Sequence, residues 1–227
     1  MHITPERPCP VSAAGVIFDM DGVLVDSADA HFHSWRQLGE EHGVAITRDA
    51  FAATFGRQNR DIVPLFFGPG AATRLQTLAG RKEELYREII RSRVPAVPGA
   101  VALVRSLHAA GVHLAIGSSG PLPNVQTVLD GMGIAGLMEV IVSEQDVTRG
   151  KPDPQVFALA CARLGLAPAR CVVIEDAPAG VEAARAAGTR VVAVLMHHPR
   201  ESLAGADLIV GRLGDLCVAD LMALVKA

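Results

Sequence analysis

The sequence has few aromatic residues, no excess of positive charge and no long apolar run. Aromatic residues make up 4% of the 227 residues although half are hydrophobic, so a folded core must be built mainly from Ala, Val, Leu and Ile. The net charge of −3 gives no electrostatic reason to bind nucleic acid. No apolar run approaches the roughly 20 residues that cross a bilayer, and the first residues lack the apolar segment of a signal peptide. We therefore expect no nucleic-acid partner and no membrane association.

Cysteine is also scarce and is not arranged as a metal site. The four cysteines are Cys9, Cys161, Cys171 and Cys217, and no two form a C-x-x-C pair. Cys161 and Cys171 lie in apolar segments, where a free cysteine behaves as a small buried hydrophobe. This usage indicates a reduced protein of the cytoplasm. We expect it to be a monomer or a weak dimer.

Short apolar runs alternate with helical stretches along most of the chain, which is typical of βαβ units with parallel strands. Strands are predicted at 15–19, 112–117, 140–143, 172–175, 190–194 and 207–210. Helices are predicted between and after them at 99–110, 122–132, 154–164, 180–187 and 213–226. Several of these helices are followed by a glycine that can end a helix. The predicted fold class is α/β, a doubly wound parallel sheet with a Rossmann-like core.

One segment interrupts this alternation, because no convincing strand occurs from about residue 27 to residue 95. Helices are predicted there at 29–43, 49–55, 59–66 and 71–94 instead. We interpret this segment as an α-helical cap domain inserted into the core. The predicted division is 1–26 and 96–227 for the catalytic core and 27–95 for the cap, with two connections that would permit hinge closure.

Two carboxylates follow the first predicted strand. Asp19 and Asp21 stand in Phe18-Asp19-Met20-Asp21-Gly22, directly after an apolar run. An unpaired charge is costly away from water, so two acids at the end of a buried strand require a counter-charge, a metal or a chemical role. Gly22 allows the chain to turn away from the strand.

Polar side chains, and a turn that ends in glycine, also follow three later strands of the predicted sheet. They are, in chain order, Ser118, Ser119, Gly120, Lys151, Glu175 and Asp176. Because the carboxyl ends of parallel strands lie at one edge of a sheet, we expect these residues to meet Asp19 and Asp21 there. Carboxylates, an ammonium and a hydroxyl-bearing turn together suit a phosphate group bound with Mg²⁺.

These segments resemble, in the same order, the four motifs of the haloacid dehalogenase superfamily. The likeness covers essentially the whole chain, with the helical insert at the position of that family's cap. It implies that Asp19 is a nucleophile that becomes a phosphoaspartate, and that Asp21 is a general acid and base. The dehalogenases of the family lack the second aspartate, because a halide leaving group needs no proton. Asp21 therefore implies a small phosphate ester as substrate.

The resemblance also implies a ligand set for the remaining residues. Mg²⁺ is the implied cofactor, and its implied ligands are Asp19, the backbone carbonyl of Asp21, Glu175 and Asp176. The implied phosphate-binding residues are Ser118, Ser119, Gly120 and Lys151.

Substrate choice is expected to depend on polar residues of the cap. The candidates are His31, Arg57, Asn59, Arg60 and Lys82. Arg57 and Arg60 are favoured because a guanidinium suits phosphate and hydroxyl groups. His31 and Lys82 are left open between a substrate contact and a structural role, and for Lys82 a surface charge of its helix is the favoured reading. The pair His197-His198 is interpreted as part of a surface loop.

Three functions remain open at this stage. The first is a Mg²⁺-dependent phosphatase for a sugar or polyol phosphate. The second is a phosphosugar mutase resembling β-phosphoglucomutase, although those enzymes carry Arg-x-x-Ser-Leu in a cap loop where this chain has Asn59-Arg60-Asp61-Ile62-Val63. The third is a non-catalytic phosphate-binding regulator, which the complete set of motif residues disfavours.

Overall fold

A computed structural model describes residues 14–54 and 57–226. Its centre is a parallel sheet of six strands in the order β3-β2-β1-β4-β5-β6. The strands are β1 Gly15–Phe18, β2 His113–Gly117, β3 Val140–Val142, β4 Cys171–Glu175, β5 Arg190–Val194 and β6 Leu208–Val210. Strand order reverses beside β1, because β2 and β4 pair with opposite edges of that strand. The predicted doubly wound sheet is therefore confirmed.

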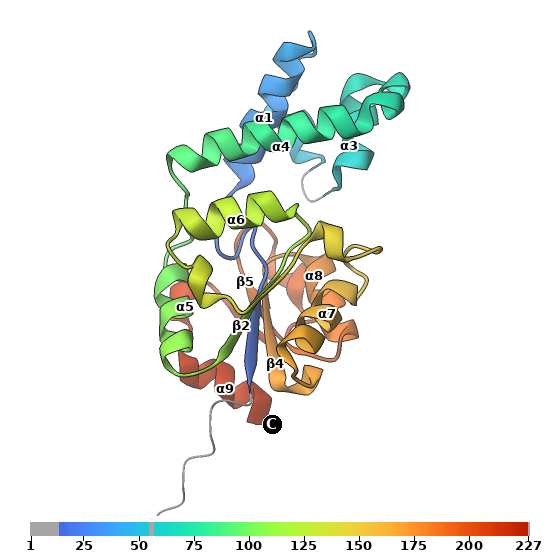
Figure 1. Ribbon diagram of the computed structural model, residues 1–227. Helices are drawn as coiled ribbons and strands as arrows, with labels where there is room; N and C mark the ends of the chain where they lie inside the picture. Colours follow the sequence, from blue (N-terminus) through green and yellow to red (C-terminus); the bar gives the residue numbers. More distant parts are fainter. Residues whose placement is uncertain (1–13, 55–56, 227) are drawn as a thin grey trace, which may run out of the picture.

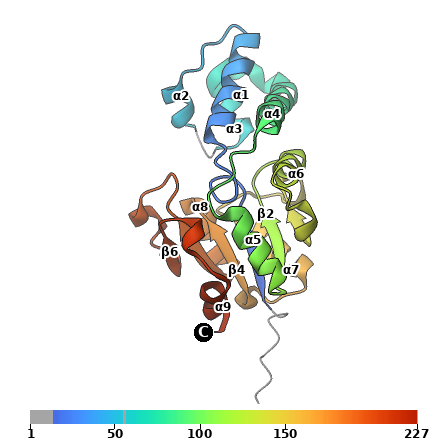
Figure 2. The same ribbon diagram turned by 90° about the vertical axis from the view of Figure 1, so that its left-hand side faces the viewer.

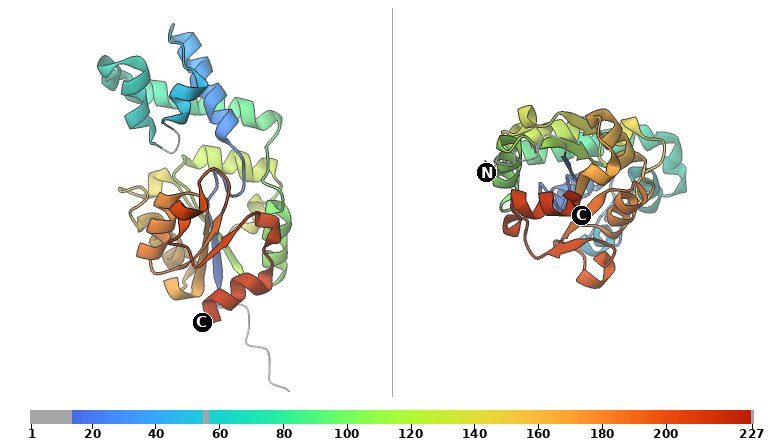
Figure 3. Two further views of the ribbon diagram at one scale, coloured as in Figure 1. Left: turned by 180° about the vertical axis from the view of Figure 1, so that it is seen from behind. Right: turned by 90° about the horizontal axis from the view of Figure 1, so that it is seen from below.

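Helices cover both faces of this sheet (Figures 1 and 3). One face carries α5 Ala100–Ala109, α6 Leu122–Gly131 and α9 Val218–Lys226, and the other carries α7 Gln155–Leu164 and α8 Pro178–Ala186. The side chains of β1 alternate between the two layers, since Val16 and Phe18 pack in the first core and Ile17 in the second. Burial on both faces explains why the strands read as unbroken apolar runs.

The cap stands beyond one end of the sheet (Figures 1 and 2). It contains α1 Ala28–Glu41, α2 Arg48–Ala52, α3 Asn59–Phe67 and α4 Leu75–Ser92. It has its own hydrophobic core, which includes Phe32, Trp35 and Phe51. The few aromatic residues of the chain are thus concentrated in the cap, where the small core needs large side chains.

Two connecting segments run side by side between the cap and the sheet. The amide of Asp26 donates to the carbonyl of Pro95 at 2.9 Å, and Val25 forms an antiparallel bridge with Ala96. The helical insert is confirmed as an element of the fold, while the boundaries 1–26, 27–95 and 96–227 stay a prediction. No helix in the described part of the chain has the length and apolar character needed to cross a membrane.

Several predicted helices end or begin elsewhere. The predicted helix 71–94 begins as a 3₁₀ helix, η2 Pro69–Arg74, where the Thr73 hydroxyl donates to the Gly70 carbonyl and competes with α-helical bonding. The predicted helix 213–226 is divided into η7 Leu213–Asp215 and α9, because the Asp220 carboxylate caps the Cys217 amide at 2.9 Å. The predicted helix 49–55 ends earlier, at the end of α2, and residue 55 lies outside the described residues. The remaining short 3₁₀ helices are η3 Ala135–Leu137, η4 Glu144–Asp146, η5 Pro168–Arg170 and η6 Arg200–Leu203.

The strand register brings the motif residues to one edge of the sheet. Phe18, the last residue of β1, lies beside Ile116 of β2 and Ile174 of β4. The Asp19 amide continues this ladder by donating to the Ile174 carbonyl at 2.9 Å. Asp19 therefore lies where β2 and β4 also end, at the edge that faces the cap.

Candidate active site

A buried ammonium joins two buried carboxylates at this edge. The Lys151 Nζ atom lies 2.5 Å from Asp19 Oδ1 and 2.6 Å from Glu175 Oε1. The side chains of all three residues are at most 10% exposed. The loop after β3 thus supplies a counter-charge for the acids that end β1 and β4.

Two glycines leave room for the acidic side chains. Gly22 has a φ of +80°, and a Cβ atom there would lie 2.1 Å from Asp176 Oδ2. A Cβ atom at Gly180 would lie 1.7 Å from Glu175 Oε1. Neither position tolerates a side chain unless the carboxylate moves, so the backbone keeps open the space into which the carboxylates project.

Three carboxylates could hold a metal ion. Asp19, Glu175 and Asp176 offer ligand atoms that all lie within 4.8 Å of one another. Burial, together with the neighbouring carboxylates, raises the pKa of Asp19 to about 7 and that of Asp176 to about 8, although Lys151 opposes both shifts. Crowded oxygen ligands that carry excess negative charge fit a hard divalent cation such as Mg²⁺.

Glu175 is the most constrained of these acids. Its Oε1 atom accepts from Lys151, and its Oε2 atom accepts from the amides of Asp176 and Ala177 at 2.9 and 3.0 Å. Both oxygens therefore have donors already. Glu175 therefore orients Lys151 and the turn after β4, while its Oε1 atom keeps a second lone pair.

Asp21 has partners different from those of Asp19. Its side chain is 31% exposed and lies 3.5 Å from the Nε2 atom of His31, and the Ser27 hydroxyl donates to it. Burial alone would raise the pKa of Asp21. The hydrogen bond and the charge of His31, together with the hydrogen bond from the Ser27 hydroxyl, outweigh burial and hold the pKa of Asp21 below its usual value. The two aspartates of the pair therefore differ in their proton affinity.

The turn after β2 is only partly available to a ligand. Ser118 is buried, and its Oγ atom accepts the amide of Gly120 at 3.0 Å. The Ser118 hydroxyl proton stays available to a phosphate oxygen, because the hydroxyl is an acceptor in that bond. The Gly120 amide, predicted to bind phosphate, is instead engaged within the turn, while Ser119 is exposed to the cavity.

The cap places His31 and Lys82 above Asp21. The Lys82 Nζ atom lies 2.8 Å from His31 Nδ1 and 2.9 Å from Glu83 Oε1, and the His31 ring stacks on Tyr86 with centroids 4.3 Å apart. Lys82 is 3% exposed, so its interpretation as a surface charge is wrong. The reason is that α4 packs against α1 along this face, which buries the lysine beside a carboxylate.

A cavity of about 250 Å³ lies between the cap and the carboxylates. Arg57 and Asn59 line it from the cap, together with an apolar wall of Trp35, Phe51 and Ile62. Arg60 lines a neighbouring cavity of about 160 Å³ that also reaches Ser118 and Lys151. The predicted cap residues thus surround the space in front of the acids, but the two arginines border different parts of it.

Comparison with known proteins agrees with this geometry. The family model for haloacid dehalogenase-like hydrolases matches residues 13–188. The chain belongs to this family. It is 36% identical to hexitol phosphatase A of Escherichia coli (strain K12) over 206 residues, covering 90% of this chain and 93% of that protein. It is 34% identical to beta-phosphoglucomutase of Bacillus subtilis (strain 168) over 210 residues, covering 88% and 90%.

A solved structure shows the same fold. The beta-phosphoglucomutase of Clostridium difficile superimposes with a TM-score of 0.81 at 24% identity, covering 94% of this chain and 97% of that one. The predicted resemblance to the haloacid dehalogenase superfamily is confirmed. So is the predicted enzyme class, a phosphoric monoester hydrolase of this family.

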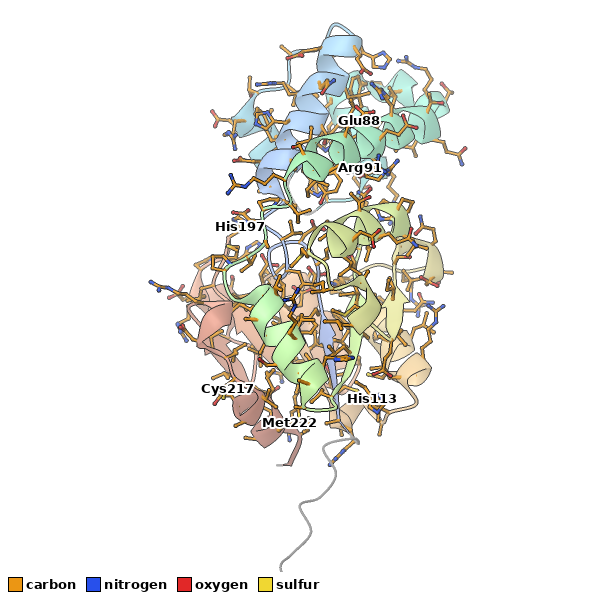
Figure 4. All side chains as sticks on the ribbon, turned by 60° about the vertical axis from the view of Figure 1, so that its left-hand side comes forward. Glu88, Arg91, His113, His197, Cys217 and Met222 are labelled. Carbon is orange, nitrogen blue, oxygen red and sulfur yellow. The ribbon has the colours of Figure 1, made fainter. Side chains whose placement is uncertain are left out.

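Sequence reasoning missed several residues that this hydrolase places at the cavity. They are Glu83, Asn124 and His198. Glu83 stands in a run of charged residues that reads as a solvated helix face, and Asn124 follows the Ser118–Gly120 turn without a motif of its own. His198 belongs to the loop interpreted as surface, yet it borders the cavity. Its neighbour His197 lies 3.4 Å from Asp26 in the connection to the cap (Figure 4).

Proposed function

We propose that this hydrolase is a Mg²⁺-dependent phosphatase that acts on a sugar or polyol phosphate through a phosphoaspartate at Asp19. The observation that carries the proposal is the buried Asp19–Lys151 pair, with Asp21 two residues away in a different environment. The named activity of hexitol phosphatase A, a relative over most of the chain, supports the substrate class. A cavity with both polar and apolar walls suits the hydroxyl groups and carbon faces of such a molecule.

In the first proposed step, an Asp19 oxygen attacks phosphorus and the ester bond to the leaving group breaks. Asp21 gives a proton to the departing oxygen. In the second step, Asp21 takes a proton from water, the water oxygen bonds to phosphorus, and the acyl phosphate bond breaks to release phosphate and restore Asp19. Lys151 and the Ser118 hydroxyl hold phosphate oxygens throughout.

A bound Mg²⁺ would supply positive charge between the Asp19 carboxylate and the phosphate. Asp19, Asp176 and the Asp21 carbonyl would hold it, with Glu175 nearby. Positive charge there would also favour the ionised Asp19 that nucleophilic attack requires, because it opposes the crowding that raises the Asp19 pKa. A phosphate near Asp21 would act in the opposite direction and favour the protonated acid.

The alternative of a phosphosugar mutase is supported by the likeness to beta-phosphoglucomutase and by His31, which lies beside Asp21 in the cap. The cap loop argues against it. Ile62 stands where the mutase pattern has serine, and it is 3% exposed in the apolar core of the cap. That position therefore offers no hydroxyl group to bind a sugar that must reorient within the site between two phosphoryl transfers.

A panel of hexose, pentose and polyol phosphates tests the proposal. With Mg²⁺ present, release of inorganic phosphate is expected from at least one of them, and Asp19→Asn should abolish it. An isomerised sugar phosphate without phosphate release would establish the mutase. Binding without either product would establish the regulator, and a panel without any of these results would refute the substrate class. The cytoplasmic location and the monomer or weak dimer stay predictions.

A further inference from the structure

One buried asparagine of the core bonds to two residues of the cap. Asn124 lies in the first turn of α6 and is 1% exposed. Its Nδ2 atom donates to Glu83 Oε2 at 2.6 Å, and its Oδ1 atom accepts from Arg87 Nη1 at 2.9 Å. Glu83 and Arg87 are four residues apart on α4, so they share one face of that helix. Both ends of a single amide are therefore used on the cap helix.

The chemistry of the partners fixes how this amide is oriented. A carboxylate can only accept hydrogen bonds and a guanidinium can only donate them. If the Asn124 amide were turned over, its NH₂ group would face Arg87 and its oxygen would face Glu83, and both bonds would be lost. The contact is therefore specific to an amide at position 124, with a carboxylate and a guanidinium opposite it.

Glu83 connects this contact to the side chains above Asp21. Its second oxygen, Oε1, accepts from Lys82 Nζ at 2.9 Å and from Asn59 Nδ2 at 2.8 Å. Lys82 in turn lies 2.8 Å from His31 Nδ1. One carboxylate thus collects donors from α3, α4 and α6. A displacement of Glu83 relative to α6 would move Lys82 and His31 relative to Asp21.

The place of Asn124 in the chain strengthens this connection. The loop of Ser118–Gly120, which is proposed to bind phosphate, is separated from α6 only by Pro121. Asn124, which contacts the cap, lies in the first turn of the same helix. One rigid helix therefore links the proposed phosphate-binding loop to the cap contact. The two short connections between cap and core leave the cap free to move unless the interface between cap and core holds it in place. Hydrogen bonds between buried groups supply such a fixed register, because a mismatch leaves a buried donor or acceptor unsatisfied.

We propose that Asn124 is a positioning residue that fixes the cap over the active site through Glu83 and Arg87. It holds α4, and with it Lys82 and His31, at the distance from Asp21 that the reaction needs. The role in catalysis rests on the proposed phosphatase function, whereas the contact between cap and core does not. Asn124 itself takes no part in the chemical steps.

A reversed hydrogen bond tests this proposal. Asn124→Asp places a carboxylate against the Glu83 carboxylate, so the two repel and the register is lost. Glu83→Gln leaves an amide group against the Asn124 amide. When the two changes are combined, the new amide can donate to the new carboxylate, which still accepts from Arg87. The pair of changes restores the contact with its direction reversed.

The expected result is a loss with Asn124→Asp and a recovery with the double variant. We expect Asn124→Asp to lower kcat/KM for the preferred sugar phosphate by about 10- to 100-fold, the range typical of a displaced catalytic constellation. The loss on a small aryl phosphate should be several-fold smaller, because its leaving group depends less on the cap. Asn124→Asp combined with Glu88→Gln is the matched control, since Glu88 is an exposed carboxylate of the same helix (Figure 4) and should rescue nothing.

Thermal unfolding of the parent, of Asn124→Asp and Glu83→Gln singly, and of the two double variants separates the possible failures. Tm changes that simply add, without recovery in the double variant, would refute the contact. Recovery of Tm in the double variant, with kcat/KM for the sugar phosphate the same in every variant as in the parent, would show that the contact is only structural. That result would overturn the positioning role. If the parent protein hydrolyses no phosphate ester, the proposed function fails, while the unfolding measurements still decide whether Asn124 joins the cap to the core.

Discussion

Replacing Lys151 with methionine removes the ammonium that joins Asp19 to Glu175. The Nζ atom lies 2.5 and 2.6 Å from the two carboxylates, and its side chain is 9% exposed. At an effective dielectric constant near 20, each contact is attractive by roughly 6 to 7 kcal/mol before the cost of burial. Burial offsets most of this, and the loss of one partner from a buried pair costs about 3–5 kcal/mol. We expect the free energy of unfolding to fall by about that amount in metal-free buffer at pH 8.

Mg²⁺ should restore part of the stability lost in Lys151→Met. The ion would supply positive charge to the same oxygens that the ammonium served. A ligand present at 100 times its Kd stabilises a protein by about 2.7 kcal/mol. The increment should be larger in Lys151→Met than in the parent protein, because the cluster of Asp19, Glu175 and Asp176 then carries one more uncompensated charge.

Urea unfolding followed by circular dichroism, with and without Mg²⁺, measures both effects. Arg149→Met is the matched control: it removes a cation from the same loop, but its side chain is 70% exposed and its partner is Asp153. The control should change stability little and should leave the Mg²⁺ increment unchanged. If Lys151→Met is as stable as the parent without metal, or if Mg²⁺ stabilises the two equally, the ammonium and the ion do not neutralise one cluster.

Three further outcomes are expected. Rapid acid quenching of the parent protein during turnover should leave phosphate on a peptide that contains Asp19. Asp19→Asn should show no such phosphate, although the variant still unfolds in a single cooperative transition. Phosphate on another peptide would reassign the nucleophile. In metal-free buffer the free energy of unfolding should rise as the pH falls from 8 to 5, because Asp19 and Asp176 have folded pKa values of about 7 and 8 against an ordinary 3.8, so the folded state binds the extra protons. A flat or opposite profile would contradict this. Arg57→Ala and Arg60→Ala should lower kcat/KM for a sugar phosphate more than for a small aryl phosphate, and equal losses on both substrates would exclude a role in substrate choice.

The edge of the sheet that carries the motif residues could be predicted, because each motif residue stands next to its own strand in the sequence. An apolar run followed by an acid identifies both the strand and its end, and parallel strands place their ends together. Asp19, Glu175 and Lys151 therefore lie together at one edge of the sheet, as expected, although the sharing of Lys151 by the two acids was not predicted. Two acids at the end of a buried strand require a counter-charge, a metal or a chemical role, and Lys151 supplies the first of these. What the pattern did not contain is the use of the Gly120 amide inside its own turn, which depends on backbone angles after β2.

The cap was harder to predict because charge alone does not show which face of a helix is buried. Arg81 and Glu84 stand on the exposed face of α4, where Arg81 also pairs with Glu41, whereas the two residues between them, Lys82 and Glu83, are buried. All four residues are charged and adjacent in sequence. The helix turns by about 100° per residue, so only the position of its neighbours decides which pair faces inward. Those neighbours are α1 and α6, one from each domain.

The two parts of the active site therefore rest on different kinds of contact. Asp19 and Glu175 lie at the ends of β1 and β4, whose side chains are buried, and Lys151 is held between them by its two ion pairs. His31 and Lys82 are fixed within a cap that has its own hydrophobic core, and that cap meets the sheet domain through buried apolar side chains of α4, Tyr86 and Ile90, as well as through the polar contact between α4 and α6. We therefore expect substitutions in the cap to change the fit to the leaving group while the carboxylates and Lys151 stay in place.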